Sequence, residues 1–109
     1  MSVDSVNNSM SPSDFTPKMQ RAIALIREAG MTEPARELDA RLSTAYTTSS
    51  EFLGELGAAI VRFREKEAGR LPPAAAELLD ECQREIGAVW PAYGPGLAGR
   101  LLRLINRLR

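Results

Sequence analysis

The chain has 109 residues, of which 44% are hydrophobic, and its 14 basic and 14 acidic residues cancel; it contains one cysteine and no histidine. This length excludes a second core, and the lone cysteine excludes an internal disulfide. Without histidine, Ser–His and Cys–His nucleophile pairs and most zinc sites are excluded. Strong helix formers dominate the composition, and the connections between the expected helices are short. We therefore predict an all-α fold, a compact antiparallel bundle of four to five short helices.

Residues 1–13 are rich in serine and asparagine. They lack the basic and apolar regions of a signal peptide, and no stretch of the chain approaches the roughly 18 apolar residues of a membrane span. We expect these residues to form a flexible N-terminal leader, with Met10 as an alternative start to Met1. We also expect the protein to be cytoplasmic, because secreted domains of this size more often carry several cysteines.

Residues 14–93 are expected to form a four-helix core. The first helix begins with Thr16 as N-cap and Pro17 at the first helical position, and it ends at Gly30. The second helix begins at Thr32. Apolar residues recur at helical spacing in both: Met19, Ala22, Ile23 and Ile26 in the first, and Ala35, Leu38, Leu42 and Ala45 or Tyr46 in the second.

The third helix begins at Thr48, which has capping-box spacing to Glu51, and it closes at Gly69. Pro72 and Pro73 start the fourth helix. The expected core residues are Leu53, Leu56, Ile60 and Phe63 in the third helix, with Phe52 and Ala59 beside them, and Ala75, Leu78, Cys82, Ile86 and Val89 in the fourth.

The C-terminal segment 94–109 is expected to form a basic amphipathic helix packed on the core. Residues 1–93 hold four more acidic than basic side chains, whereas residues 94–109 hold four arginines and no acid. The apolar stripe consists of Leu97, Leu101, Leu104, Ile105 and Leu108, and the basic stripe of Arg100, Arg103 and Arg107. Such a helix can complete the bundle, lie on an anionic membrane, or bind a partner's groove.

Two further features are candidate partner-binding sites. Gly54, Gly57, Ala58 and Val61 form a stripe of small residues on the third helix, where each glycine costs about 1 kcal/mol relative to alanine. Close approach of another helix, from this chain or a second copy, would explain that cost. Trp90 and Tyr93 are residue types that often anchor interfaces, although core packing is the alternative interpretation.

We find no pattern that indicates catalysis, a cofactor or a metal. Cys82 lies on an expected core line, and the carboxylates of Glu77, Glu81 and Glu85 lie off that line. The glycines match no phosphate-binding motif. An enzyme that uses carboxylates and a metal would need inward-facing acids.

The leading hypothesis is a non-catalytic helical module that binds another protein, such as a small bacterial or phage adaptor, a modulator, or an antitoxin or immunity protein. A homodimer is a further option for the interface. The alternative hypothesis is a protein that binds a membrane surface or nucleic acid through its arginine-rich C-terminal helix. The acidic body and the lack of interleaved aromatic residues argue against nucleic acid.

Overall fold

The computed structural model describes residues 12–108, and its described side chains are those of residues 15–96 and 98–108. These residues form helices and connecting turns without any strand, so the predicted all-α class is confirmed. The helices are α2 (Pro12–Glu28), α3 (Thr32–Ser43), α4 (Ser49–Glu67), α5 (Pro73–Val89) and α6 (Gly96–Leu108), with the short 3₁₀ helices η1 (Ala68–Arg70) and η2 (Pro91–Tyr93).

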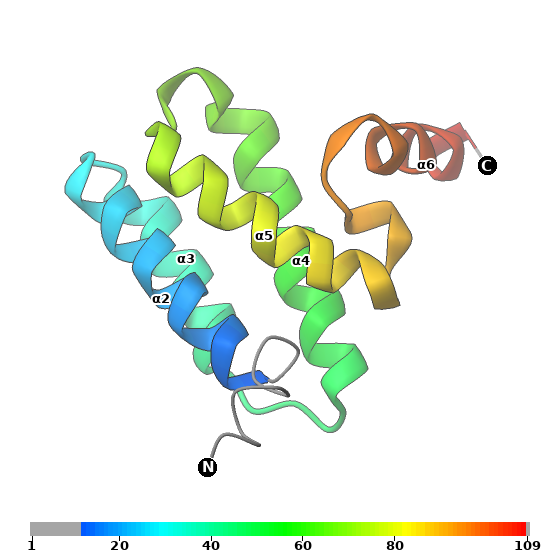
Figure 1. Cartoon of the computed structure of the whole chain (residues 1–109), viewed down its shortest axis with the longest axis horizontal. Helices are drawn as coiled ribbons and strands as arrows, with labels where there is room; N and C mark the ends of the chain where they lie inside the picture. Colours follow the sequence, from blue (N-terminus) through cyan, green and yellow to red (C-terminus); the bar gives the residue numbers. More distant parts are fainter. Residues whose placement is uncertain (1–11, 109) are drawn as a thin grey trace, which may run out of the picture.

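Helices α2 to α5 enclose the hydrophobic core (Figure 1). Helix α2 packs between α3 and α5, and α4 closes the arrangement by contacting both α3 and α5. Most of the predicted apolar faces point inward. The largest fully buried side chains are Met19, Ile26, Leu38, Leu56, Ile60, Leu79, Cys82 and Ile86.

The first helix begins earlier than predicted. Helix α2 starts at Pro12, so Thr16 is not its N-cap, and Pro17 lies inside the helix rather than at its first position. Inside a helix, proline lacks the N–H that would bond to the carbonyl four residues earlier, and its ring crowds that carbonyl, so local propensity does not predict this position. The predicted leader lies outside the described residues up to position 11, and positions 12 and 13 belong to α2.

Two predicted helix signals appear as expected, and a third does not. Gly30 ends α2 with φ of 91°, a conformation that glycine adopts without penalty. The Thr48 hydroxyl accepts a hydrogen bond of 3.0 Å from the Glu51 N–H, which caps α4. Gly69, by contrast, is not in the left-handed region, because α4 ends at Glu67 and continues into η1.

The buried face of α5 is rotated slightly from the predicted one. Leu79 rather than Leu78 is fully buried, and Val89 is 47% exposed. Buried Gln83 joins this face although it is polar. Val89 is exposed because it is the last residue of α5, where η2 turns the chain away from the core.

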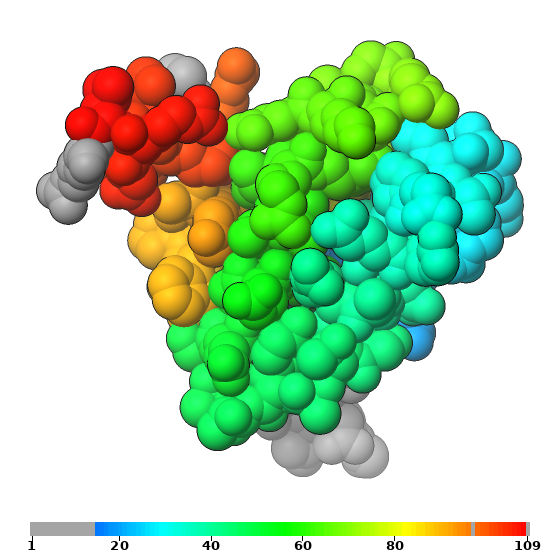
Figure 2. Space-filling model, turned by 180° about the vertical axis from the view of Figure 1, so that it is seen from behind, coloured from blue at the N-terminus to red at the C-terminus, as the bar shows by residue number. Residues whose placement is uncertain are grey.

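Helix α6 does not extend the core. It lies beyond the end of α5 and contacts the rest of the chain chiefly through η2, as Figures 1 and 2 show. Gly96, with φ of 80°, makes the turn that directs α6 away from the bundle. The expectation that the apolar side of the C-terminal helix packs on the core is therefore wrong for the described residues, since Leu101, Leu104, Ile105 and Leu108 are all exposed.

Candidate binding surfaces

Helix α6 is attached to the bundle through its small and basic side. Gly99 contacts the carbonyl oxygen of Gly94, and a side-chain carbon at position 99 would collide with that oxygen. The Arg103 guanidinium donates to the carbonyl oxygen of Ala92 at 2.8 Å and lies 3.8 Å from the Glu65 carboxylate. The Arg103 side chain is only 17% exposed. Gly99 and Arg103 therefore define the face of α6 that meets the protein.

The apolar side chains of α6 point the other way. At about 100° per residue, Gly99 and Arg103 lie about 40° apart around the helix, whereas Leu101 lies about 160° from both. Leu104, Ile105 and Leu108 are 49%, 50% and 78% exposed. We call Leu101, Leu104, Ile105 and Leu108 the outer face of α6. Nothing in the described part of the chain covers this face, so it is an unpartnered hydrophobic surface.

Charge reinforces the asymmetry of this helix. Arg100 and Arg107 are exposed on the flank between the outer face and Arg103, and segment 94–109 contains no acidic residue. A surface that covers the outer face therefore meets positive charge along one side.

The small-residue stripe of α4 is covered by this chain itself. Gly54 lies under the Trp90 ring, with an ideal Cβ position 3.1 Å from that ring. At Gly57, the corresponding position lies 2.9 Å from Ile86 Cγ2 and 2.9 Å from Tyr93 Cδ2. Within the stripe, Ala58 is half-buried and Val61 is buried. The close approach that explains both glycines is thus made within this chain, by Trp90 at Gly54 and by Ile86 of α5 and Tyr93 of η2 at Gly57.

Trp90 and Tyr93 hold η2 against α4. The Trp90 indole N–H donates to the Ser50 carbonyl oxygen at 2.8 Å, and the two aromatic rings are 6.2 Å apart. Trp90 remains 40% exposed and Tyr93 is half-buried. These aromatic residues therefore position η2, and through it α6, while part of the Trp90 ring faces solvent.

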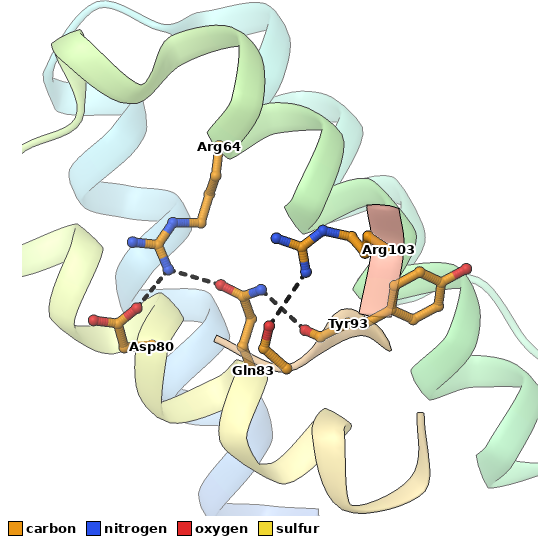
Figure 3. Close-up of polar contacts among 6 residues, drawn as sticks. Arg64, Asp80, Gln83, Tyr93 and Arg103 are labelled. Atoms are coloured by element: carbon orange, nitrogen blue, oxygen red, sulfur yellow. Dashed lines mark hydrogen bonds and ion pairs between the residues drawn. The ribbon is translucent and has the colours of Figure 1, made fainter. Parts of the chain in front are cut away.

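A groove that the sequence did not predict lies between α4, α5 and α6. It has a volume of about 850 Å³. We call it the arginine groove, because its lining includes Arg64, Arg84, Arg100 and Arg103. The Arg64 guanidinium donates to Asp80 Oδ1 and to Gln83 Oε1, each at 2.7 Å (Figure 3). The Gln83 amide in turn donates to the Tyr93 carbonyl oxygen at 3.0 Å. The groove could not be predicted from the sequence, because these arginines come from three separate helices.

The Cys82 thiol is buried, and the neighbouring acidic side chains on α5 form ion pairs with Lys18. Burial raises the pKa of the Cys82 thiol to about 12, and the nearby Glu85 carboxylate adds to that effect. Glu81 and Glu85 lie 3.2 Å and 3.8 Å from the Lys18 ammonium group. Among residues 15–108, His, Cys, Asp and Glu side chains do not gather in groups of three or more that could bind a metal. None of the described helices is long and apolar enough to cross a membrane.

No family model matches the chain, and no curated protein or solved structure is detectably similar to it.

Proposed function

We propose that this chain is a non-catalytic binding protein that docks on another protein through α6. The observation that carries the proposal is the direction of the outer face, which points away from the only elements of the described chain that could bury it. An amphipathic helix with exposed apolar anchors fits a hydrophobic groove on a partner. The lone thiol of Cys82 is compatible with the cytoplasm, where we place the protein.

The charge of α6 indicates the chemistry of the partner's groove. In an antiparallel pair of α6 helices packed through their outer faces, the two arginine flanks would lie on the same side with no acidic residue from either helix, which disfavours that homodimer. A groove with acidic residues along one rim would instead pair with Arg100 and Arg107 and would speed association. An adaptor, a modulator or an immunity-type protein would use such a contact.

The proposal is tested with a pair of exposed-residue variants. Complete burial of a leucine or isoleucine contributes about 1.5–3 kcal/mol. Leu101 and Ile105 are 48% and 50% exposed, so about half of the surface of each side chain is left for a partner to cover. Replacing both with glutamine should therefore weaken partner binding by about 1.5–3 kcal/mol, or roughly ten- to a hundredfold. Val89→Gln is the matched control, since Val89 is equally exposed but lies on α5.

Binding is measured first by capture from host lysate and then with the purified partner. A partner that is retained by wild type and Val89→Gln but lost from Leu101→Gln/Ile105→Gln supports the proposal. Equal affinity of all three proteins for the purified partner would refute it. Circular dichroism establishes that the variants keep their helical content.

A second candidate function, attachment to an anionic membrane surface, is favoured by the four arginines and the wide apolar arc of segment 94–109. The net negative charge of residues 1–93 opposes it, and Arg103 is engaged within the chain. Sedimentation with phosphatidylglycerol vesicles tests this candidate. Binding that disappears in Arg100→Gln/Arg107→Gln would favour the membrane, and no binding at low salt would eliminate it.

A further inference from the structure

The arginine groove concentrates positive charge in a chain whose formal net charge is zero. Its lining holds four arginines and two acidic residues, Glu65 and Asp80. The groove therefore carries two more positive than negative side chains. A cleft lined predominantly by one sign of charge focuses the electrostatic potential and attracts ions of the opposite sign.

Two of the arginines are held in fixed positions. Arg64 is 26% exposed and is fixed by Asp80 and Gln83 (Figure 3). Arg103 is fixed by the carbonyl oxygens of Ala92 and Gly94. In both guanidinium groups these hydrogen bonds use Nη1. The Nη2 atoms make no hydrogen bond to any residue in the described part of the chain. Each inner arginine therefore keeps free donors while its position is already ordered, which lowers the entropic cost of binding.

The other two arginines lie at the rim of the groove. Arg84 on α5 and Arg100 on α6 are both exposed. Within the part of the chain that the structure describes, no carboxylate lies within 4.0 Å of either guanidinium group. Four guanidinium groups thus share one groove with only two carboxylates, and a bound anion would relieve their mutual repulsion.

We infer that the arginine groove binds a phosphate group in its dianionic form. A phosphate monoester carries a charge of about −1.5 to −2 at neutral pH and presents three strong acceptor oxygens. That charge matches the excess of two positive side chains in the groove. The planar fork of arginine donors suits phosphate oxygens, because two parallel N–H groups reach two oxygens at once. The phosphate is carried either by a soluble metabolite or by a lipid headgroup.

The test is a calorimetric titration with inorganic pyrophosphate at low salt. Wild type should bind it saturably with a stoichiometry of one. The variant Arg84→Gln/Arg100→Gln removes the two rim arginines. It should weaken pyrophosphate binding at least about tenfold, because hydrogen bonds between arginine and a charged phosphate contribute more to affinity than neutral hydrogen bonds do. The control variant is Arg21→Gln/Arg27→Gln, which removes the same charge from exposed positions on α2.

Equal affinity of the two double variants would overturn the inference, because binding would then reflect overall charge alone. Absence of saturable binding by wild type would overturn it as well. Vesicles of phosphatidic acid in phosphatidylcholine distinguish the two sources of phosphate. Vesicle binding that pyrophosphate displaces assigns the phosphate to a lipid headgroup, and pyrophosphate binding without vesicle binding assigns it to a soluble ligand.

Discussion

The close packing at Gly57 makes a quantitative prediction. In Gly57→Ala, the new methyl group would lie 2.9 Å from Ile86 Cγ2 and Tyr93 Cδ2, and 3.1 Å from Tyr93 Cβ. Carbon atoms pack best at about 3.5–4.0 Å, so both neighbours must move by roughly 0.5 Å or more. Ile86 is fully buried and cannot yield without disturbing the core.

The expected change combines two opposing effects. Alanine in place of an interior helical glycine gains about 1 kcal/mol in propensity. Overpacking of a well-packed region costs about 1–3 kcal/mol. For Gly57→Ala we expect a net loss of about 0–2 kcal/mol in the free energy of unfolding, in place of the gain of about 1 kcal/mol that propensity alone would give, and a loss at the upper end lowers Tm by several degrees.

Gly69→Ala is the matched control. No atom lies within 4 Å of the Cβ position at Gly69, and its φ is not positive. This variant should be more stable than wild type by about 0.4–1 kcal/mol, because the unfolded chain loses entropy. Urea unfolding followed by circular dichroism measures both changes. A Gly57→Ala protein that is more stable than wild type by the full propensity gain of about 1 kcal/mol would refute the close packing of η2 and α5 on α4.

Three other predictions concern single side chains. The Cys82 thiol of the native protein should resist Ellman's reagent at pH 8, because burial raises its pKa to about 12; rapid labelling of the native protein would contradict the burial. The free energy of unfolding should also fall between about pH 9 and 12, because in that range only the unfolded state loses the thiol proton. Trp90→Phe removes the donor to Ser50 and should lower the free energy of unfolding by about 1 kcal/mol in urea titrations. Arg103→Ala should speed amide exchange in α6 alone, and unchanged exchange would show that other contacts hold α6. The same variant should weaken pyrophosphate binding, since it loses an inner arginine of the groove and no longer holds Arg100 there.

The core of the bundle could be predicted from the sequence because local signals and burial agree there. The residues Met19, Ala22, Ile23 and Ile26 recur at helical spacing, and all four are buried. The Thr48 cap is equally local, since it depends on residues only three positions apart. The start of α2 was misplaced because proline favours the first position of a helix, whereas Pro17 lies inside α2, where its missing N–H removes a backbone hydrogen bond.

The arginine groove could not be predicted in the same way. Arg64, Arg84 and Arg100 lie on three helices, and their proximity depends on how α4, α5 and α6 are arranged in space. Gln83 gave no sequence signal either, because a polar residue beside Cys82 on a helix is usually exposed. Its burial depends on Arg64 and on the Tyr93 carbonyl oxygen, which satisfy both ends of its amide.

The orientation of α6 could not be predicted from the spacing of its residues. The spacing of leucines and arginines predicts an amphipathic helix, but periodicity is the same whether the apolar side turns inward or outward. The side is decided by Gly99, which allows the helix backbone to touch Gly94, and by Arg103, which reaches the carbonyl oxygens of η2. The basic side of α6 is consequently attached to the protein while the leucines are left exposed. Because exposure of that apolar surface to water is unfavourable, a binding partner would gain from covering the same face that the fold leaves open.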